Sequence, residues 1–533
     1  MNISAPMRIS DVVKPWADRL PDQKAVVDPN GSWSYRELVG IISQTADWLR
    51  GSGVRAGDRV MIVGENCREF AAVLLAVASL DAWPVPVNPR LSARELDAIR
   101  DHCGPRRVVF TKSVSLNAAE HATRHGALLE DVRDVGRISL GPLNENANPE
   151  PIDADIGSRV AALIYTSGTT GLPKGVMLTH DNLLFSASGA AKIRSLNSDD
   201  RVYGILPLSH IVGLSIVFLG TLLSGATIYL EPRFDPVVAK ATLEKQRITV
   251  MLGVPSMFSL FLQYANMRKL QSFDFPALRI ISCSGAPLPP ATKSSVERLF
   301  GLSLHHGYGI TECSPNVAQV RPDQPPRTDN SVGPMFPGVE SRLVGPDRQQ
   351  VAVGEVGELW VRGPNIMKGY YRAPEETAAA IDAEGWFNTR DLARFEDGNL
   401  FIVGRTKDLI IRFGFNVYPA EVEGVLNTHP AVAQSAVVGR TIEGDEEILA
   451  FVQPSAGSRL TEAALAEYAA KHLAPYKRPS HIVLVSNMPM TPSGKIAKAD
   501  LAKLAEDMKH AGSPAHSAYS RTSMNTSPNP PAK

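Results

Sequence analysis

The stretch YTSGTTGLPKG, residues 165–175, combines three glycines, four Ser or Thr hydroxyls and one lysine. Glycines let a backbone approach an anion closely, hydroxyls donate hydrogen bonds, and lysine adds a positive charge. The composition therefore indicates a loop that holds phosphate. Taken alone, the same composition is equally typical of a flexible surface turn.

The stretch differs from the Walker A phosphate loop. That motif has lysine directly after its second glycine, a Ser or Thr next, and a helix that starts there. Here Lys174 follows Pro173, and Gly175 comes next. The following VMLTH predicts a strand, with the next helix beginning near Asp181, so no helix N-terminus lies behind the loop. The hypothesis of a P-loop NTPase is therefore disfavoured, and only an observed cleavage of ATP to ADP and phosphate would support it again.

Helical and extended patterns alternate around this loop. Ser34 and Glu37 have capping-box spacing and open an amphipathic helix, which Gly51 and Gly53 end. A further helix is expected at EFAAVLLAVASL. Strands are expected at DRVMIVG, WPVPVNP, VAALIYT, RVYGILPL, ATIYL, ITVMLGVP and RIISCSG. This order predicts an α/β fold with mixed, largely parallel sheets.

Length and local pattern predict two domains and a tail, because 533 residues exceed what one hydrophobic core serves. We expect a large N-terminal domain over residues 1–403 and a small, mobile α+β domain over 404–510, joined near Gly404–Lys407. Its expected helices are PAEVEGVLN and TEAALAEYAAKHLA, and its expected strands are QSAVVGR, ILAFVQP and SHIVLVS. Residues 511–533 lack apolar content and are expected to be disordered.

Composition excludes several classes of protein. Basic and acidic residues balance at 55 each, so no overall field attracts nucleic acid or an anionic membrane. No stretch reaches the roughly 18 apolar residues of a membrane-spanning helix, and the first residues lack the apolar core of a signal peptide. The four cysteines are far apart and are expected to be reduced thiols: Cys67, Cys103, Cys283 and Cys313. A cytoplasmic protein is expected.

Four further motifs follow the phosphate loop along the chain: GYGITE (307–312), GWFNTRD (385–391), GRTKD (404–408) and PSGK (492–495). Each alone is modest evidence. In this order and spacing the set resembles the adenylate-forming superfamily, which comprises acyl-CoA synthetases, luciferases and the adenylation domains of peptide synthetases. The resemblance covers about residues 10–505 and is strongest to acyl-CoA synthetases.

The resemblance implies a reaction in two steps. A carboxylate attacks the α-phosphate of ATP and forms an acyl-adenylate and pyrophosphate. The thiol of coenzyme A then attacks the acyl carbonyl and releases AMP. A carboxylate is a poor electrophile, and the mixed anhydride makes its carbonyl open to attack at neutral pH. Catalysis of this kind depends on positioning and on neutralising phosphate charge.

The resemblance also assigns residues to ATP and to Mg²⁺. The loop would hold the β- and γ-phosphates through Thr166, Ser167, Gly168, Thr169, Thr170, Gly171 and Lys174. The adenine would lie against Gly285, Ala286 and Pro287, and against Tyr308 and Gly309. Asp391 would accept hydrogen bonds from the ribose hydroxyls, Thr311 would contact the α-phosphate, and Glu312 would bind Mg²⁺. Without the resemblance, Glu312 would be a solvated carboxylate at a helix start and Asp391 a surface partner of Arg390 or Arg394.

Three further roles follow from the last motifs. Lys495 is the implied catalytic lysine of adenylation, Arg405 contacts ribose or phosphate, and Lys407 is the hinge about which the small domain moves. His210 matches a position at the acyl pocket and coenzyme A tunnel, although a partly buried structural histidine is the alternative. Gly414 would line the pantetheine path.

The chain departs from the family pattern at two places. Where the family has Thr-Gly-Asp, this chain has Arg390 before Asp391, and Arg412 and Phe413 replace small residues before Gly414. Loop geometry at the nucleotide and the shape of the coenzyme A tunnel are therefore open, and Arg412 could meet a coenzyme A phosphate.

The acid is expected to be fatty or aromatic. The segment YGILPLSHIVGLSIVFLG carries no acidic residue to pair with an ammonium group, so amino acids are disfavoured. HIVGL, GVPSMFSLF and the stretch after Glu312 suggest an apolar pocket. Two alternatives stay open: transfer of the acyl group to a carrier protein, and a catalytically silent nucleotide- or acyl-binding homologue. The oligomeric state is also open, with a homodimer as one candidate.

Overall fold

The computed structural model describes residues 7–166, 173–413, 415–442, 445–455, 457–491 and 495–510. The chain forms two compact units, of which the first ends at Ile402 and the second begins at Val403. Six residues with a predicted role lie outside the described residues: Ser167, Gly168, Thr169, Thr170, Gly171 and Gly414. The predicted tail, residues 511–533, also lies outside them, and its disorder stays a prediction, as does the division of roles between two domains.

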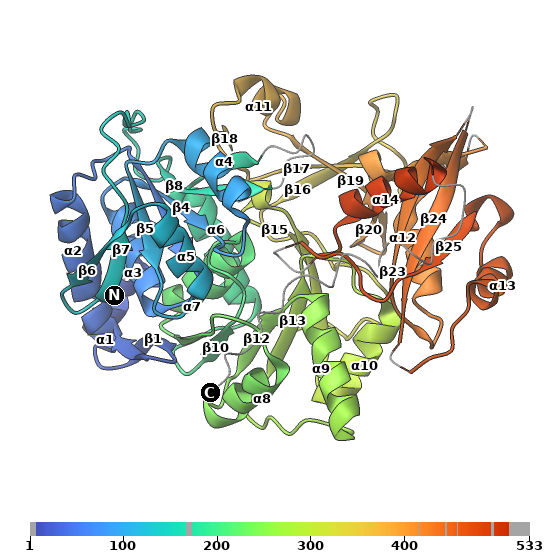
Figure 1. Ribbon diagram of the computed structural model, residues 1–533, viewed down its shortest axis with the longest axis horizontal. Coiled ribbons are helices and arrows are strands. Elements are labelled where there is room, and N and C mark those ends of the chain that lie inside the picture. The colour runs from blue at the N-terminus through green and yellow to red at the C-terminus, as the bar shows by residue number, and fades with distance from the viewer. Residues whose placement is uncertain are drawn as a thin grey trace, which may run out of the picture. The chain divides into compact units, whose positions relative to one another are not determined.

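The N-terminal part of the first unit contains a five-stranded mixed sheet (Figure 1). β3 (Arg59–Gly64) lies between β4 (Trp83–Val87) and β5 (Arg107–Thr111) and runs parallel to both. All of β3 is buried, as expected for a strand covered on both faces. β7 (Gly136–Leu140) and β6 (Leu128–Val132) continue the sheet, each antiparallel to its neighbour.

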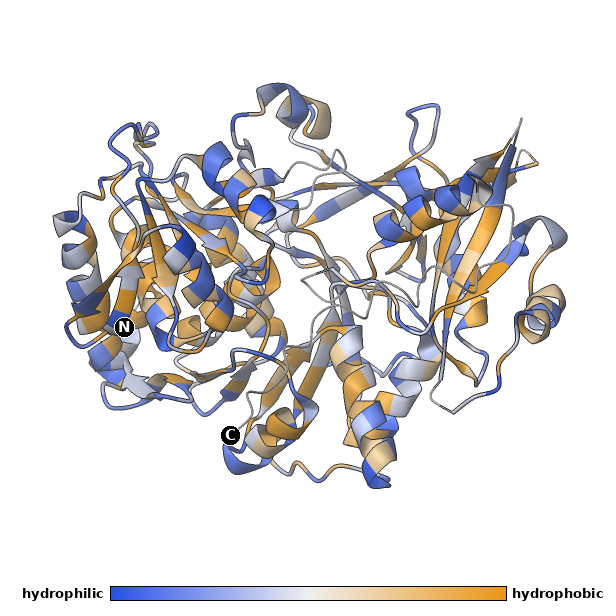
Figure 2. Cartoon of the chain, in the orientation of Figure 1, coloured by the Kyte–Doolittle hydropathy of each residue, from blue (hydrophilic) through white to orange (hydrophobic). Residues whose placement is uncertain are grey.

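Helices cover this sheet with their apolar faces. α2 (Tyr35–Gly51) begins at the predicted capping box, in which Ser34 and Glu37 each accept a hydrogen bond from the other's backbone N–H. It packs on α3 (Arg68–Ser79), which is buried throughout from Glu69 to Ala78. Figure 2 shows the hydrophobic strands inside and the hydrophilic outer faces of such helices.

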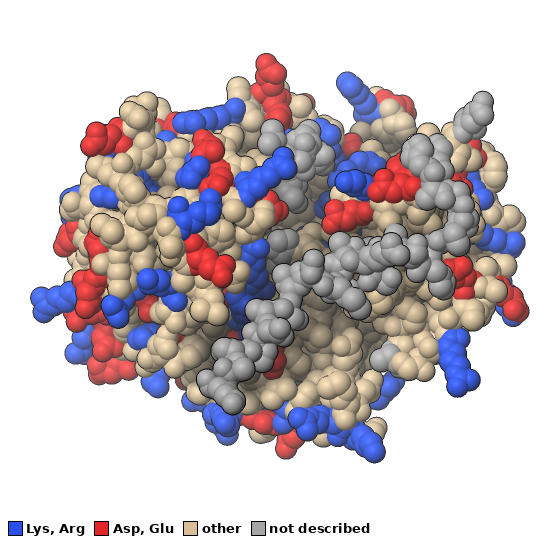
Figure 3. All heavy atoms as spheres, viewed as in Figure 1, with Lys and Arg blue, Asp and Glu red and all other residues tan. Residues whose placement is uncertain are grey.

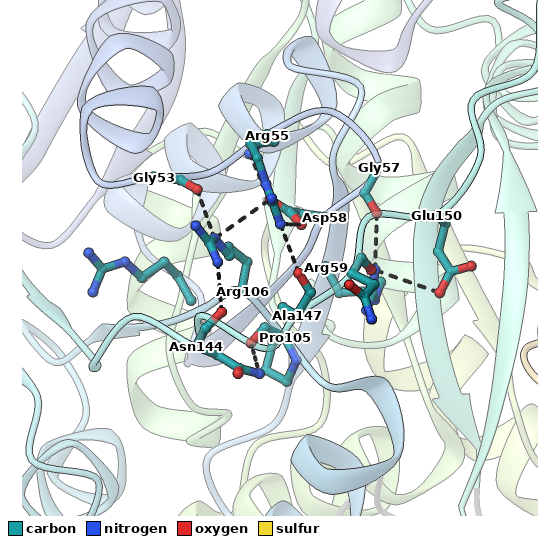
Figure 4. Close-up of polar contacts among 12 residues, drawn as sticks. Gly53, Arg55, Gly57, Asp58, Arg59, Pro105, Arg106, Asn144, Ala147 and Glu150 are labelled. Atoms are coloured by element: carbon teal, nitrogen blue, oxygen red, sulfur yellow. Dashed lines mark hydrogen bonds and ion pairs between the residues drawn. The ribbon is translucent and has the colours of Figure 1, made fainter.

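A buried arginine fastens the segment after β7 to this sheet (Figure 4). Arg59 is 1% exposed and lies 3.6 Å from the Glu150 carboxylate. Its guanidinium also donates to four backbone carbonyl oxygens, those of Gly57, Cys103, Gly104 and Asn148. Its charge is therefore matched inside the protein, as a buried charge requires.

The larger sheet of the first unit has eight strands in the order β15-β14-β13-β12-β10-β11-β1-β2. The strands from β14 to β1 run parallel, whereas β15 and β2 are antiparallel edges. Their bounds are β1 (Lys24–Asp28), β2 (Gly31–Ser34), β10 (Arg201–Gly204), β11 (Thr227–Leu230), β12 (Val250–Gly253), β13 (Ile280–Ser284), β14 (Leu304–Gly309) and β15 (Asn316–Gln319). The carboxyl ends of the parallel strands therefore meet at one edge, where α/β sheets bind ligands.

Helices alternate with the strands of this sheet as the sequence predicts. α8 (Pro236–Lys245), α9 (Pro255–Arg268) and α10 (Pro290–Phe300) connect β11, β12, β13 and β14 in turn (Figure 1). The predicted α/β class with mixed, largely parallel sheets is confirmed, and each of the seven strands predicted in this part of the chain is present.

The phosphate loop joins two antiparallel strands. β8 (Val160–Thr166) pairs with β9 (Lys174–Thr179), and Thr166 lies opposite Lys174. β18 (Gly369–Tyr370) adds a short third strand beside β9. The next helix, α6 (His180–Ile193), begins only after β9. A strand rather than a helix thus follows the loop, as the sequence predicts and as a Walker A loop does not allow.

An antiparallel sheet ends the first unit. Its order is β16 (Glu340–Val344), β17 (Gly357–Arg362), β19 (Phe387–Glu396) and β20 (Asn399–Arg405). β19 carries Asp391, and the boundary between the two units falls within β20. The peptide that leads to the second unit is therefore a sheet strand.

The second unit is a three-stranded sheet with helices on both faces. β24 (Asp445–Pro454) pairs antiparallel with β23 (Val432–Ile442) and parallel with β25 (His481–Leu484). The helices are α12 (Pro419–Leu426), α13 (Glu462–His472) and α14 (Lys498–His510). α12 and α13 pack on one face of the sheet and α14 on the other. The hairpin of β21 (Ile410–Arg412) and β22 (Phe415–Val417) precedes them.

Surface and membrane properties agree with the composition. In the described part of the chain, no helix is both long and apolar enough to cross a bilayer. The four cysteines are buried and form no disulfide. Figure 3 shows basic and acidic side chains interspersed over the visible surface of the first unit.

One buried carboxylate fastens the amino ends of three neighbouring strands of the large sheet. Asp200, just before β10, accepts hydrogen bonds from Thr249 before β12 at 2.7 Å and from Arg279 before β13 at 2.7 Å. Burial by itself raises the pKa of Asp200, but the Arg279 and Thr249 hydrogen bonds outweigh it and hold the pKa below its usual value. Asp200 therefore stabilises the fold in its ionised form.

We predict that Asp200→Asn lowers the free energy of unfolding at pH 7 by about 2 kcal/mol, because Arg279 loses its charged partner. A depressed folded-state pKa adds stability above the unfolded pKa near 3.9, and this stability disappears as the pH falls through the folded pKa. The difference between variant and wild type in urea unfolding should therefore shrink from pH 7 toward pH 3. Asp199→Asn, at the exposed neighbour, is the control, and an Asp200→Asn difference independent of pH would contradict the assignment.

Candidate active site

The motif GYGITE lies at the carboxyl end of β14, where the strand turns into a short 3-10 helix, Thr311–Cys313. A side chain at Gly309 would put its Cβ 2.1 Å from the backbone oxygen of Pro315, so only glycine fits. The N–H of Ile310 donates to that same oxygen at 3.1 Å. The turn thereby places Tyr308, Thr311 and Glu312 at the sheet edge where ligands bind.

Tyr308 and Asp391 meet although 83 residues separate them in sequence. The Tyr308 hydroxyl donates to Oδ2 of Asp391, and the backbone N–H of Asp391 donates to Oγ1 of Thr389 at 3.1 Å. Asp391 is 2% exposed, so the alternative of a surface aspartate is wrong. Burial first, and then the Asp391 carboxylate, raise the pKa of Tyr308 well above its ordinary value. The phenol therefore stays protonated and orients the carboxylate.

Arg390 occupies the position at which the family pattern has glycine. Its backbone conformation explains why glycine is favoured there. Its φ is +58°, in the left-handed region that L-residues adopt at a cost of about 1–2 kcal/mol. Its N–H donates to Oδ1 of Asn388 at 2.8 Å, which supports the turn. The loop before Asp391 thus adopts a left-handed turn without glycine, and the Arg390 side chain is exposed.

Glu312 and Lys174 lie on either side of one tyrosine that the sequence analysis missed. The Tyr370 hydroxyl donates to Oε1 of Glu312 at 3.0 Å. Lys174 Nζ lies 5.2 Å from the centroid of the Tyr370 ring and 2.6 Å from Oε2 of Glu376. Burial and the Glu312 carboxylate raise the pKa of Tyr370, and the charge of Arg390 opposes them. Nothing in the local sequence marks either residue, because the pairing of β18 with β9 brings Tyr370 to Lys174, and Glu376 lies in the helix that follows β18.

The predicted adenine wall follows the end of β13. Gly285 has φ +88°, which favours glycine at this turn, and the backbone oxygen of Ala286 accepts a hydrogen bond from His306 at 3.4 Å. Pro287 is exposed. Gly285, Tyr308 and Gly309 line one cavity of about 30 Å³ at the carboxyl ends of β12, β13 and β14. The structure therefore brings these three predicted residues together.

The wall of the same cavity is mixed in character, so the expected apolar acid pocket stays a prediction. The wall includes Val212, Ile216 and Leu252, but also Arg194, Ser282 and Gln319. The aromatic residues of GVPSMFSLF, Phe258 and Phe261, are instead core residues, in edge contact with Phe300. They face other rings because α9 packs on α10. Apolar composition alone therefore did not distinguish core from cavity.

His210 lies just before an unusual helix. Residues Val212–Leu219 form a π-helix, which the sequence analysis did not predict, and both Val212 and Ile216 line the cavity. Nδ1 of His210, which is half-buried, accepts the N–H of Val212 at 3.4 Å. π-Helical turns occur often at functional sites, because they displace a side chain by one position. His210 is thus next to the cavity wall in sequence, while its proposed role stays a prediction.

Three predicted residues belong to the second unit. The backbone N–H of Lys495 donates to Oγ1 of Thr491 at 3.1 Å, and its carbonyl accepts the N–H of Thr491 at 2.7 Å. Lys495 is half-buried at this turn. Arg405 ends β20, Lys407 lies in the following 3-10 turn, and both are exposed.

The second departure from the family pattern also has a backbone explanation. Phe413 has φ +53°, and its N–H donates to Oδ1 of Asp445 at 2.9 Å. Nη1 of Arg412 donates to the carbonyl oxygen of Arg478 at 2.5 Å. One arm of the Arg412 guanidinium is therefore committed within its own unit, which weakens the case for Arg412 as a coenzyme A phosphate ligand.

In the described part of the chain, no group of three or more His, Cys, Asp or Glu side chains could hold a metal ion. Mg²⁺ binds proteins through one or two carboxylates and completes its shell with water and substrate phosphates. Glu312, with one carboxylate oxygen held by Tyr370, fits such a partial site.

Comparison with known proteins gives consistent matches over nearly the whole chain. The family model described as AMP-binding enzyme matches residues 13–371, and the AMP-binding enzyme C-terminal domain matches residues 421–495. A feruloyl-CoA synthase of Amycolatopsis sp is 37% identical over 487 residues, which cover 90% of this chain and 96% of that protein. An indoleacetate–CoA ligase of Aromatoleum aromaticum is 34% identical over 506 residues, with 93% and 98% covered.

A solved structure agrees with these relatives. ATP-bound MatB from Rhodopseudomonas palustris superposes with a TM-score of 0.81 at 29% identity, covering 94% of this chain and 99% of that one. The resemblance to adenylate-forming enzymes is therefore confirmed by family models, by relatives and by fold. The chain belongs to the AMP-binding enzyme family.

Proposed function

We propose that this protein is an AMP-forming carboxylic acid–CoA ligase whose acid is aromatic, with a fatty acid as the second candidate. The observation that carries the proposal is the contact of Tyr308, which lines the cavity, with the buried carboxylate of Asp391. The contact of Glu312 with Tyr370 supports it. Family membership supports the reaction class, since the two relatives described above are a CoA synthase and a CoA ligase.

Asp391 would hold the ribose of ATP. A carboxylate can accept several hydrogen bonds, as two vicinal hydroxyls require, and the hydrogen bond from Tyr308 holds this one in a fixed orientation. The adenine would lie against Gly285, Ala286 and Pro287 and the ring of Tyr308. In this arrangement the α-phosphate would lie near Thr311.

The phosphates would be held by the loop and by Lys174. Lys174 would have to exchange its ion pair with Glu376 for a contact with phosphate. The Glu376 side chain is half exposed, so water can solvate its carboxylate at little cost in free energy. Mg²⁺ at Glu312 would neutralise negative charge on the phosphate oxygens. Tyr370 holds Oε1 of Glu312 by a hydrogen bond, and Oε2 would be the oxygen that binds the ion. The loop then releases pyrophosphate, which suits a hairpin loop without a helix behind it.

Lys495 would act in adenylation from the second unit. Its flexible stem carries a compact charge to the carboxylate and the α-phosphate as negative charge accumulates there. Lys407 would be the hinge, and Arg405 would contact ribose or phosphate. In the second half-reaction coenzyme A would reach the acyl carbonyl past His210 and Gly414. We further propose a cytosolic location, in agreement with four buried thiols, whereas a homodimer stays a prediction for light scattering to test.

The aromatic acid is favoured by the relatives. Both are named for an acid with an aromatic ring, and their similarity extends over nine-tenths of the chain. A carrier-protein ligase and a silent homologue are the remaining alternatives. A panel of carboxylic acids scored for AMP and for acyl-CoA by mass tests all three, because AMP without thioester indicates the carrier-protein ligase and no acid-dependent pyrophosphate indicates the silent homologue.

We predict that Lys495→Ala lowers adenylation about 100-fold or more while thioester formation from preformed acyl-adenylate is spared. The two half-reactions are measured separately, as acid-dependent pyrophosphate release and as conversion of synthetic acyl-adenylate. Lys503→Ala, at an exposed lysine of α14, is the matched control and should behave as wild type in both. Near-normal adenylation by Lys495→Ala would refute the assignment.

We predict that Glu312→Gln raises the Mg²⁺ concentration needed for half-maximal adenylation by about tenfold or more, because a neutral amide is a weaker ligand for a hard cation. Tyr370→Phe, which only frees the carboxylate to rotate, should have a smaller effect in the same direction. Mg²⁺ titrations of pyrophosphate release measure both. Glu375→Gln, at an exposed position of α11 (Pro374–Ala380), serves as the control, and an unchanged Mg²⁺ requirement in Glu312→Gln would exclude it as the ligand.

A further inference from the structure

The cavity at the sheet edge has a buried arginine in its wall. Arg194, the C-cap residue that follows α6, is 4% exposed. Its Nη1 donates to the backbone oxygen of Ala190 at 3.1 Å, but its buried Nε has no hydrogen-bond partner among the described residues. Within those residues, no carboxylate forms an ion pair with it. Arg59 differs from Arg194 in this respect, because its guanidinium donates to four carbonyl oxygens and lies beside the Glu150 carboxylate.

Two more polar groups in the same wall lack partners. Oγ of Ser282 on β13 and Nε2 of Gln319 on β15 are buried, and neither has a hydrogen-bond partner in the described structure. Their residues are 3% and 5% exposed. Three side chains from three separate elements therefore present hydrogen-bond donors to one cavity. A core that served only packing would hold apolar groups here, since each unsatisfied buried polar group costs about 1–3 kcal/mol.

The cavity carries a net positive charge. Burial lowers the pKa of Arg194 to about 10, which leaves it protonated at neutral pH. Burial, and then the charges of Arg194 and Lys293, lower the pKa of the neighbouring His305, so this histidine adds no charge. No acidic side chain is among the described residues of the lining. The C-terminal end of α6 offsets part of the charge of Arg194, as helix C-termini do for cations, but not all of it.

The cavity also has the size and place for part of a substrate. A volume of about 30 Å³ accommodates about two water molecules, which is comparable to one carboxylate group. Tyr308 and Gly309 line the same cavity. Arg194 lines the same cavity, and Thr311, which is expected to contact the α-phosphate, lies two residues after Gly309 in the chain. We infer that an acid whose reacting carboxylate lies near Thr311 directs its remote end toward Arg194.

We propose that the acid activated by this protein carries a second, negatively charged group at its remote end, and that Arg194, Gln319 and Ser282 bind that group. The inference rests on the proposed ligase function and narrows its substrate class to acids with a distal anion, such as dicarboxylates. Arg194 and its two neighbours are then specificity-determining residues.

The experiment compares acids that differ only at the remote end: terephthalate with 4-methylbenzoate, and octanedioate with octanoate. Wild type should favour the dianion of each pair in kcat/KM, measured as acyl-CoA formation, by about 10- to 100-fold. Arg194→Met should lose that preference and use the methyl-ended acid better than wild type does. Arg194→Lys should restore part of it, since it keeps the charge. Gln319→Leu should reduce the preference less.

Binding is measured separately, as the rise in thermal unfolding temperature that each acid produces, so that the result does not depend on turnover. Arg133→Met, at a surface arginine whose side chain is 88% exposed, is the matched control and should retain the wild-type preference. Equal losses for both members of a pair in Arg194→Met would show that Arg194 only caps α6, and would overturn the proposal.

Two further outcomes also overturn the proposal and can be told apart. Activation of 4-methylbenzoate and octanoate in preference to terephthalate and octanedioate would leave the ligase function intact and refute the distal anion. Failure of wild type to release pyrophosphate with any acid would refute the ligase function itself.

Discussion

The hydrogen bond from Tyr308 to Asp391 is the contact on which the rest of the candidate site depends. It joins the carboxyl end of β14, in the eight-stranded sheet, to β19 in the antiparallel sheet. Glu312, in the turn after β14, meets Tyr370 of β18 in the third sheet. Residues 307–313 are therefore held by two other sheets of the first unit. Because both contacts use buried or half-buried oxygens, these side chains have defined positions before any ligand binds.

In the two loops that depart from the family pattern, the backbone conformation is kept although the side chains differ. Arg390 and Phe413 replace residues that are small in the family pattern, yet both have left-handed φ values, as a glycine there would. Each N–H is held by a nearby side-chain oxygen, of Asn388 and of Asp445. Those hydrogen bonds help to offset the cost of the left-handed conformation, so the chain keeps the loop while it changes the side chain.

Two buried arginines of the first unit differ in how far the protein itself supplies partners for their charge. Arg59 meets carbonyl oxygens and Glu150 and stabilises a connection between segments. Arg194 has one carbonyl acceptor and a cavity beside it. A buried guanidinium costs several kcal/mol unless it is paired, so the second arrangement is understandable when a ligand supplies the missing partner. On this proposal the cavity both accommodates the remote end of the acid and recognises its charge.

The sequence by itself determined the α/β class, many of the strands and helices, the difference from a Walker A loop and the family, because periodicity and short motifs are local properties of the chain. Only the tertiary structure decided which residues meet. Tyr370 reached Glu312 by strand pairing, and Arg194 reached the cavity because α6 ends beside the parallel sheet. The aromatic residues of GVPSMFSLF were expected in the pocket but lie in the core, since hydrophobic composition is the same for both places. Long-range contacts depend on how sheets pack, and no short stretch of sequence contains that information.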